Sequence, residues 1–431
     1  MIIKNFQALA TSALRKQLLT IAEAGYEAIN TKKAISRALS FDAKKNTLSA
    51  QNRKFDLKSF KRIFVLAFGK AALESAMAIK EILGERIYFG MVIDVNVLAD
   101  KDEGKWLFRQ ATHPNVSEQN VAAAKEALKN LSNLSGDDLV ICSISGGGSA
   151  IFEVPYKLPA DKAALVFKAM TKGGATISEL NTVRKHISRV KGGQLAKAMH
   201  PATVINLLFS DVPGDDLSVI ASGPLIKDPT TLLEAKKLIE KFEVLNLSSL
   251  DKLDLIETPK EEKYFERVFN ILAVSPKAAL NALKEKAELL GWEVKIFSDK
   301  YQGEARVLAG QILGASHKGQ CLLGAGESTV KILGQGAGGR NQEMALAALP
   351  HIKDNQVLGC FASDGHDNTE AAGAIADVSV RQRAYGLRLT AESFLNNNDS
   401  FNFFEQTGDL VQTGQTGSNV ADFFVCLWGK N

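Results

Sequence analysis

The stretch from Asp138 to Ser149 reads DLVICSISGGGS and joins an apolar run directly to three consecutive glycines between serines. A short apolar run that ends in such a loop predicts a strand buried on both faces, as in a parallel sheet. Glycines allow backbone N–H groups to converge on an anion, and the serine hydroxyls would add donors. The stretch therefore predicts a buried strand whose carboxyl end carries an anion-binding loop. This loop comprises Ser145, Gly146, Gly147, Gly148 and Ser149.

Similar apolar runs lie on both sides of this stretch and alternate with helical patterns. Strands are predicted at Arg62–Phe68 (RIFVLAF), Arg86–Val95 and Thr203–Phe209 (TVINLLF), and a helix at Val121–Leu134. Buried strands that alternate with helices predict a parallel sheet with helices on both faces. The N-terminal part of the chain is therefore expected to be a Rossmann-like α/β domain.

The chain has 431 residues, more than one ordinary hydrophobic core accommodates, so two domains are expected. Hydrophobic periodicity fades and charge rises between Leu247 and Glu261. The alternation resumes with a strand at Phe269–Val274 and a helix at Pro276–Leu290. We therefore expect an N-terminal domain at 1–255 and a smaller C-terminal α/β domain at 256–431.

The composition, with 45% hydrophobic and 23% charged residues, is that of a soluble globular protein. The net charge is +4 and the charges are interspersed, whereas a nucleic-acid-binding protein would show a basic stripe. No apolar run approaches the ~18 residues that a membrane span needs. The four cysteines lie far apart without a CxxC pair, so we expect reduced, buried thiols and a cytoplasmic protein.

Several polar and charged residues follow predicted strands directly. Lys70 follows a strand and a glycine, SDVPGDD at 210–216 begins where another strand ends, and Asp364 lies in SDG after a third. In open α/β sheets, ligands bind at the carboxyl ends of the strands. Carboxylates such as Asp211 and Asp215 suit Mg²⁺ or a general base, whereas Lys70 suits a phosphate.

A glycine-dense loop, GQGAGGRNQE at 334–343, precedes another predicted helix. Such a loop indicates a close approach of the backbone to a neighbour. Arg340 stands at the helix start, where a cation is unfavourable against the helix dipole unless an anion joins it. Anion-binding loops, cations and strand-end carboxylates together indicate phosphoryl transfer. The sequence has no GxxxxGK[ST] motif, so a kinase of this type would bind phosphate differently.

Two other classes of function stay open at this point. Gly334, Gly336 and Gly339 satisfy GxGxxG, and Asp364 follows at the distance of a ribose-binding acid, which would indicate an NAD-dependent enzyme. Against this, Arg340 begins the helix where a dinucleotide fold usually has a small or apolar residue. The third class is a binding protein without catalytic activity.

The ordered motifs of the chain resemble those of the class II glycerate kinases, whose C-terminal part is called the MOFRL domain. The matching segments are GKAA at 69–72, THP at 112–114, SISGGGSA at 143–150, ELNTVRKHISRVKGGQLA at 179–196, SDVPGDDLSVIASGP at 210–224, GESTV at 326–330, GGRNQE at 338–343, SDGHDNTEAAGA at 363–374 and TGSNVADF at 416–423. They span nearly the whole chain.

The resemblance implies two α/β domains with the active site in the cleft between them. It implies ATP-dependent phosphorylation of D-glycerate to 2-phosphoglycerate with Mg²⁺ or another divalent cation, and it is compatible with a homodimer. Lys70 and Arg340 would hold the transferred phosphoryl group, and Asp211 would be the base or a metal ligand. Further ATP- or substrate-binding residues would be the Ser145–Ser149 loop, Asn181, Arg184, Glu327, Gly338, Gly339, Asn341, Asp364 and His366, and the metal candidates are Asp211, Asp215 and Asp364.

Two segments depart from the pattern of the family. The family usually has DGIDG where this chain has DGHDN at 364–368, and GPTGTN where it has GQTGSN at 414–419. His366 and Asn368 leave open whether the acceptor is glycerate or a related small hydroxy acid. Some family members are labelled hydroxypyruvate reductases, so an NAD(P)H-dependent reductase stays as the alternative.

Overall fold

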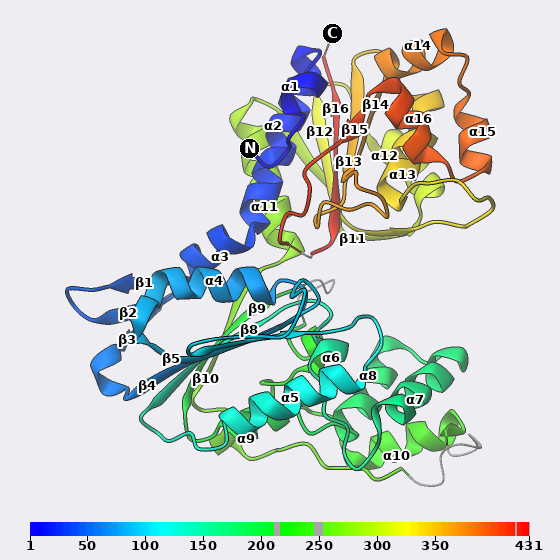
Figure 1. Cartoon of the computed structure of the whole chain (residues 1–431). Coiled ribbons are helices and arrows are strands. Elements are labelled where there is room, and N and C mark those ends of the chain that lie inside the picture. Colours follow the sequence, from blue (N-terminus) through cyan, green and yellow to red (C-terminus); the bar gives the residue numbers. More distant parts are fainter. Residues whose placement is uncertain (211–215, 245–252, 419, 431) are drawn as a thin grey trace. The chain divides into compact units, whose positions relative to one another are not determined.

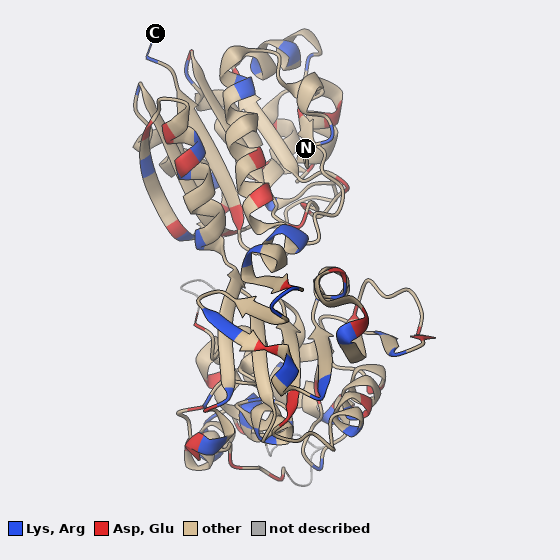
Figure 2. Ribbon diagram, turned by 90° about the vertical axis from the view of Figure 1, so that its left-hand side faces the viewer, with Lys and Arg blue, Asp and Glu red and all other residues tan. Residues whose placement is uncertain are grey.

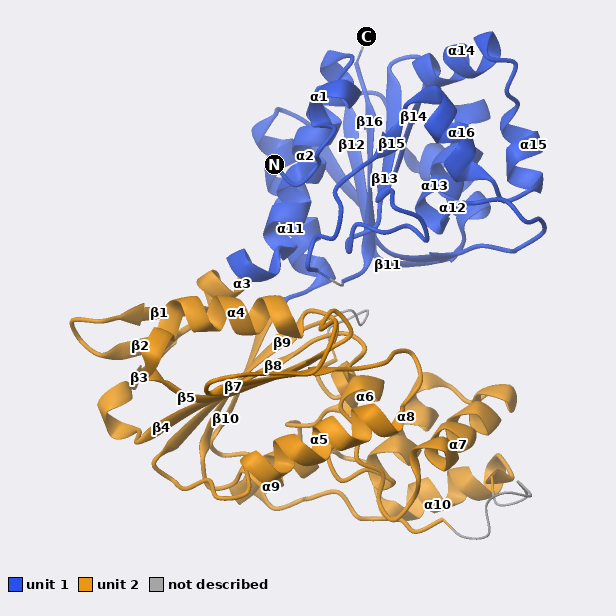
Figure 3. Cartoon of the chain, in the orientation of Figure 1, with its two compact units in different colours: residues 1–33, 212–214, 274–431 blue, residues 34–211, 215–273 orange. Residues whose placement is uncertain are grey.

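The computed structural model describes residues 1–210, 216–244, 253–418 and 420–430. The chain forms two compact units (Figure 3): unit 1 contains residues 1–33, 212–214 and 274–431, and unit 2 contains residues 34–211 and 215–273. Each unit is a sheet with helices against it.

Unit 2 is built on a seven-stranded sheet in the order β10-β9-β8-β4-β5-β7-β6. Its strands are β4 (Arg62–Phe68), β5 (Ile87–Asp94), β6 (Lys101–Glu103), β7 (Trp106–Gln110), β8 (Asp138–Ile144), β9 (Thr203–Phe209) and β10 (Val268–Val274). The pairs from β9 across to β7 are parallel, and β6 is antiparallel to β7. Every residue of β8 and β9 is buried, which is why their sequences are apolar without alternation.

Helices cover both faces of this sheet (Figure 1), with α4 on one face and α5, α6 and α9 on the other. The helices are α3 (Thr31–Ala38), which begins in unit 1, α4 (Ala72–Leu83), α5 (Glu118–Asn130), α6 (Gly148–Ile151), α7 (Ala160–Lys172), α8 (Ile177–His186), α9 (Gln194–Met199) and α10 (Leu232–Lys241). A short antiparallel sheet of β1 (Leu39–Asp42), β2 (Thr47–Ala50) and β3 (Arg53–Asp56) precedes β4. The predicted Rossmann-like architecture of this part is confirmed.

Unit 1 contains a six-stranded sheet in the order β11-β12-β16-β13-β14-β15. The strands are β11 (Glu293–Glu304), β12 (Gln320–Thr329), β13 (Gln356–Phe361), β14 (Gly373–Asp377), β15 (Leu410–Val411) and β16 (Asp422–Trp428). Only β11 and β12 pair in parallel, and the other pairs are antiparallel. The second unit is thus α/β, as predicted, but its sheet is mixed.

Two layers of helices enclose the sheet of unit 1 (Figure 1). Helices α2 and α11 pack on one face, and α12 and α13 pack on the other. The helices are α1 (Phe6–Leu9), α2 (Ala13–Ile29), α11 (Pro276–Leu289), α12 (Ala305–Ala315), α13 (Arg340–Ala348), α14 (Val378–Gly386), α15 (Ala391–Asn396) and α16 (Ser400–Thr407).

The two units differ from the expected ranges of 1–255 and 256–431 at both ends of the first range. Strand β10 was expected to open the C-terminal domain, yet it is the edge strand next to β9 in unit 2. There the Asn206 amide donates to Asn270 Oδ1 at 2.7 Å, and the Val204 N–H donates to the Arg267 carbonyl at 2.9 Å. The loss of periodicity near residue 250 therefore precedes the last strand of the first sheet.

The N-terminal residues belong to the same unit as the C-terminal half of the chain, and a buried arginine explains why. Arg15 on α2 is 1% exposed. Its Nε donates to Asp377 Oδ2 at 2.5 Å, and its Nη1 donates to Asp409 Oδ1 at 2.8 Å. Leu18 and Leu19 on the same helix are fully buried. Helix α2 is thus held on unit 1 by both ion pairs and apolar contacts.

Replacing Arg15 with methionine is expected to lower the free energy of unfolding by about 3 kcal/mol, because it removes the cation of Asp377 and one of the two cations that pair with the buried Asp409, the other being Arg383. Urea unfolding followed by tryptophan fluorescence measures this, since the Trp292 indole donates to Gln17 on α2 at 3.0 Å. Lys16→Met changes the neighbouring exposed cation and is the matched control. Equal effects of the two substitutions would contradict the assigned role of Arg15.

The structure bears on the sequence predictions about the cysteines and about membrane-spanning segments. The four cysteines are free and buried, as predicted. None of the helices in the described ranges combines the length and apolar character that a bilayer span requires. Figure 2 shows Lys and Arg interspersed with Asp and Glu along both units.

Candidate active site

Two of the predicted motifs meet at the carboxyl edge of the parallel sheet in unit 2. Strands β4 and β8 are parallel neighbours, so the residues that follow them lie side by side. The Lys70 N–H donates to the Gly146 carbonyl at 2.9 Å, and the Ala71 N–H donates to Ser145 Oγ at 3.0 Å. At Gly69, φ is +116° and a Cβ would lie 2.3 Å from Ser145 Oγ, so only glycine fits. GKAA and SGGGS therefore form one structural element.

The main chain of Lys70 is held on both sides, and its side chain lies against the glycine loop. The Asn96 amide donates to the Lys70 carbonyl at 3.0 Å. A Cβ on Gly147 would lie 3.2 Å from Lys70 Cγ and 3.0 Å from the His113 ring. Burial and the charge of Lys70 lower the pKa of His113. Lys70 is half-buried and has no carboxylate within ion-pair distance among the described residues.

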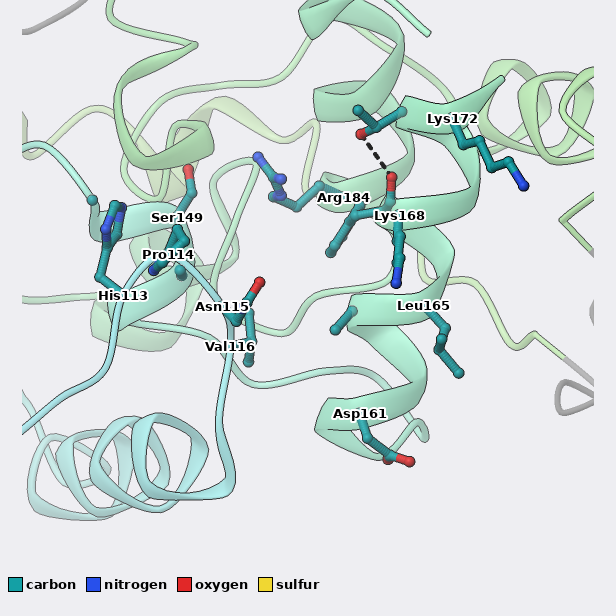
Figure 4. Close-up of a pocket in the computed structure, with 15 residues that line it drawn as sticks. His113, Pro114, Asn115, Val116, Ser149, Asp161, Leu165, Lys168, Lys172 and Arg184 are labelled. Atoms are coloured by element: carbon teal, nitrogen blue, oxygen red, sulfur yellow. Dashed lines mark hydrogen bonds between the residues drawn. The ribbon is translucent and has the colours of Figure 1, made fainter. Parts of the chain in front are cut away.

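A cavity of about 1140 Å³ opens beside this loop (Figure 4). Residues His113–Val116 form one wall, and Leu165 and Lys168 of α7 form another. Arg184 reaches from α8 toward Ser149. The remaining lining residues include Gly147, Ala150, Asp161, Ala164, Phe167, Thr171 and Lys172. Apolar walls combined with cations and a glycine loop suit a nucleotide.

A chain of hydrogen bonds connects the loop to α8. The Ser222 hydroxyl donates to Asn181 Oδ1 at 3.0 Å, and the Ser149 and Ser222 hydroxyl oxygens are 2.9 Å apart. Since Ser222 has only one proton, Ser149 must be the donor in the second bond. In this arrangement Ser149 presents a lone pair to the cavity. This arrangement does not leave the Ser149 proton for an anion, and donation by the Ser145 hydroxyl stays a prediction.

Arg184 occupies the end of this chain of hydrogen bonds. Its Nη1 donates to Asn181 Oδ1 at 3.1 Å, and its guanidinium carbon lies 4.4 Å from the centre of the Phe167 ring. Burial lowers the pKa of Arg184, and the charge of Glu153 opposes that shift. No carboxylate among the described residues forms an ion pair with it. A desolvated guanidinium at the cavity wall is suited to receive the anionic group of a ligand.

A second group of predicted residues meets at one edge of the sheet in unit 1. Strands β12 and β13 point the same way because each is antiparallel to β16, which lies between them. Glu327 near the end of β12, Asp422 at the start of β16 and Arg340 at the start of α13 therefore converge. The Arg340 Nε donates to Asp422 Oδ2 at 2.6 Å, and its Nη1 donates to Glu327.

The N-terminus of α13 is capped by a buried carboxylate. Asp367 Oδ1 accepts from the Asn341 N–H at 3.0 Å, and Oδ2 accepts from the Gln342 N–H at 2.7 Å. The Asn341 side chain donates to Asp367 at 3.1 Å and to Asp422 at 2.8 Å. Asn341 was predicted to bind ligand, but it is 1% exposed and instead joins two buried carboxylates. It is a structural support of Arg340.

The glycine-dense loop approaches another segment of its own chain. The Leu333 and Gly334 N–H groups donate to Asn398 Oδ1 at 2.6 and 3.0 Å, and the Ala337 N–H donates to Asp399 Oδ1 at 2.9 Å. A Cβ on Gly336 would lie 2.4 Å from Asp399 Cβ. These close contacts explain the glycines at the start of the loop without a ligand.

The end of the same loop lines a cavity of about 700 Å³ within unit 1. Its lining includes Ser328, Thr329, Gly338, Gly339, Arg340, His366, Asp367, Asn368 and Asn398. His366 Nδ1 lies 3.2 Å from the Thr369 carbonyl, which can only accept, so Nδ1 carries the proton. Asp364 does not line this cavity, and its Oδ1 accepts from the His366 N–H at 2.9 Å.

Comparisons with known proteins identify the family of this chain. Residues 17–252 match a family described as "Domain of unknown function (DUF4147)", and residues 320–422 match the MOFRL family. The glycerate 2-kinase of Pyrococcus horikoshii is 36% identical over 88% of this chain and 89% of its own length. The chain belongs to the glycerate 2-kinase family.

Two further relatives of this family are informative. The crystal structure of glycerate kinase from Thermotoga maritima superposes with a TM-score of 0.84 at 32% identity, covering 96% of this chain and 98% of that one. An Agrobacterium vitis protein, provisionally named a hydroxypyruvate reductase, is 37% identical over 85% of this chain and 87% of its own length.

The dinucleotide alternative does not fit unit 1 of this family member. In a dinucleotide fold the strand that carries the ribose-binding acid is the parallel neighbour of the strand before the glycine loop. Here β16 lies between β12 and β13. The loop N–H groups that would meet a pyrophosphate instead donate to Asn398 and Asp399. Gly334 and Gly336 are therefore structural residues of the loop.

Other site residues were missed, and two predicted ones cannot be placed. Asp211 and Asp215 lie outside the described residues. Ser222, Asp367 and Asp422 were not singled out, although each lies within a motif that carried the family resemblance. Ala221 and Ser222 have positive φ angles of 49° and 63°, a conformation that costs non-glycine residues about 1 kcal/mol or more and often marks a functional site.

The cap of α13 predicts a pH dependence of stability. Burial, reinforced by the charge of Asp422, raises the pKa of Asp367 to about 7, against about 3.9 in an unfolded chain. A raised folded-state pKa means that stabilisation is complete below the unfolded pKa and is lost as the pH rises through about 7. Asp367→Asn has no titrating group at this position, so its stability does not fall with pH for this reason. The stability of Asp367→Asn relative to wild type should increase between pH 4 and 7, by at most about 1.4 kcal/mol per pH unit.

Urea unfolding at several pH values measures this difference. Asp354→Asn, which changes an exposed carboxyl of the same unit, is the control. A difference between Asp367→Asn and wild type that does not vary with pH would contradict the assignment.

Proposed function

We propose that the chain phosphorylates the 2-hydroxyl of D-glycerate with ATP. The observation that carries this proposal is the hydrogen bond from the Lys70 N–H to the Ser145–Ser149 loop, whose Gly147 and Ser149 line a nucleotide-sized cavity. Phosphoryl transfer depends more on positioned cations and backbone N–H donors than on covalent catalysis. Lys70 supplies a cation, and the glycine loop supplies backbone N–H groups. Membership of the glycerate 2-kinase family supports the acceptor.

In the proposed reaction the 2-hydroxyl oxygen of glycerate attacks the γ-phosphorus of ATP. The bond from that oxygen to phosphorus forms, the bond from phosphorus to the β,γ-bridging oxygen breaks, and ADP leaves with the bonding electron pair. The hydroxyl proton passes to a base, for which the sequence nominates Asp211. Lys70 and Arg340 offset the negative charge on the phosphoryl oxygens.

We assign the ligand groups by their charge. The Ser145–Ser149 loop and Lys70 receive phosphate oxygens, while the apolar part of the cavity beside Leu165 receives the base. Arg184 binds an anionic group in a forked geometry, since its guanidinium lacks a carboxylate partner in the described chain. His366 and Asn368 of unit 1 are proposed to contact ligand through the cavity that they line.

Mg²⁺ is proposed to enter with ATP. In kinases this ion is usually held by one or two carboxylates together with phosphate oxygens and water. Within the described ranges, no group of three or more His, Cys, Asp or Glu side chains is arranged to hold a metal. One carboxylate is enough beside a nucleotide, so the candidates remain Asp364 and, outside the described residues, Asp211 and Asp215.

A coupled assay of ADP release, with and without D-glycerate and Mg²⁺, tests the proposal. Glycerate-dependent ADP release is the expected result. Oxidation of NADH with hydroxypyruvate would instead identify a reductase, and ATP binding without either reaction would identify a binding protein. The kcat/KM values of a panel of related small hydroxy acids, compared with that of D-glycerate, show whether a chain with His366 and Asn368 prefers a different phosphoryl acceptor.

A further inference from the structure

A lysine behind the glycine loop makes a contact that the proposed reaction does not use directly. Lys191 is 0% exposed and follows α8 on the segment VKGG. Its Nζ donates to the Gly148 carbonyl at 2.7 Å. Lys191 does not line the cavity, so it reaches the loop from the protein interior.

This contact fixes the direction of a peptide group in the loop. The carbonyl of Gly148 and the N–H of Ser149 belong to the same planar trans peptide, so they point in opposite directions. The Gly148 carbonyl also accepts from the Phe152 N–H at 3.2 Å, within α6. With the Gly148 carbonyl held by two donors, the Ser149 N–H points away from Lys191, and Ser149 is a residue of the cavity wall.

The groups around Lys191 shift the pKa of its ammonium group. Glu153 is 2% exposed, and no donor in the described chain meets its carboxyl in hydrogen-bond geometry, although Ser188 and Val154 lie close enough to influence it. Burial lowers the pKa of Lys191 to about 7, the charge of Glu153 opposes that shift, and the charge of Arg184 adds to it. Burial likewise raises the pKa of Glu153.

The segment that carries Lys191 is also tied to the second support of the loop. The Gly192 N–H donates to the Ser222 carbonyl at 3.0 Å, and the Ser222 hydroxyl holds Ser149. A Cβ on Gly148 would lie 2.8 Å from Ala221 Cβ, so the loop packs directly on that strained turn. Gly148 is thus held by Lys191 and Ser149 by Ser222, and the two segments that carry Lys191 and Ser222 are hydrogen-bonded to each other.

We propose that Lys191 is a positioning residue of the nucleotide phosphate site, which directs the Ser149 N–H toward the phosphates through the Gly148 carbonyl and adds a positive charge behind the loop. Glu153 is the countercharge that keeps Lys191 protonated. This role rests on the proposed kinase function, because it assumes that ATP is the ligand of the loop.

The test compares Lys191→Met with wild type in steady-state kinetics at saturating D-glycerate. KM for ATP is expected to rise about tenfold, the lower end of what supporting partners of a binding site contribute. Because only the placement of the loop changes, kcat should fall less than KM rises. Lys237→Met on α10, which changes an exposed lysine of the same unit, should behave as wild type. Thermal unfolding of each variant checks that it is folded.

The pH profile separates positioning from a structural effect. In wild type, KM for ATP should rise as the pH passes about 7 and Lys191 loses its charge. This step should be absent from Lys191→Met, and a step that this variant retains belongs to another group at the cavity, such as ATP itself or His113. Glu153→Gln should move the step of Lys191 to lower pH, since the countercharge is gone.

Each outcome decides the inference. Unchanged KM for ATP in folded Lys191→Met, or identical pH profiles in all variants, would overturn it. If Lys191→Met does not fold, the shift of the step in Glu153→Gln decides alone. Failure of the proposed function itself would look different, because wild type would then release no ADP with D-glycerate.

Discussion

Replacing Lys70 with methionine is expected to reduce kcat by about 10³-fold, the scale of losing a group that stabilises transition-state charge. The reason lies in how firmly the residue is held. Its N–H donates to the Gly146 carbonyl and its carbonyl accepts from Asn96, so the ammonium starts from a fixed point at the carboxyl edge of the sheet. Methionine keeps the length and removes the charge.

The loss should be specific to the reaction. Lys70 forms no ion pair with a described carboxylate, so no buried charge is stranded and the melting temperature should stay within a few degrees. Lys168→Met changes a cation of α7 that lines the cavity beside the glycine loop, and its effect should be confined to a modest rise in KM for ATP. A folded Lys70→Met enzyme with wild-type kcat would remove Lys70 from the mechanism.

Arg340→Lys is expected to reduce kcat by about 10³-fold, comparable to the loss of an arginine finger. A lysine keeps the charge but cannot use Nε on Asp422 while presenting other N–H groups to a phosphoryl oxygen. The structure makes this variant preferable to Arg340→Ala. Asp422 is 3% exposed, and removing its only described cationic partner would leave a buried carboxylate unpaired.

The ion pair between Arg340 and Asp422 suggests a control that separates loss of activity from loss of stability. Arg340→Ala should lose both activity and stability, by about 3–5 kcal/mol, whereas Arg340→Ala with Asp422→Asn should recover stability but not activity. Chemical unfolding and ADP release, measured on the same samples, distinguish the two effects. Wild-type turnover in the stable double variant would show that Arg340 only neutralises Asp422.

The strands of unit 2 were predictable because a strand buried on both faces has an uninterrupted apolar sequence. The predicted bounds of β4, β8 and β9 coincide with the observed ones. Lys70 and the Ser145–Ser149 loop were predictable for a related reason: parallel strands place their carboxyl ends at one edge. Sequence order there implies spatial proximity.

The domain division and the partners of Arg340 could not be predicted in the same way. The sequence around Arg15 does not indicate that it pairs with Asp377 and Asp409, which lie more than 300 residues away. The glycines of the 334–339 loop indicate a close approach, but they do not reveal whether the neighbour is a ligand or the chain itself. In this protein much of that neighbour is Asn397–Asp399.

We propose that the γ-phosphoryl group of ATP is transferred to the 2-hydroxyl of D-glycerate. Proton-coupled phosphorus NMR of the product tests this most directly. A phosphate on carbon 2 couples to the single hydrogen of that carbon and gives a doublet, which is the predicted result. A triplet, from a phosphate on carbon 3 with its two hydrogens, or the absence of any phosphorylated glycerate would contradict the account.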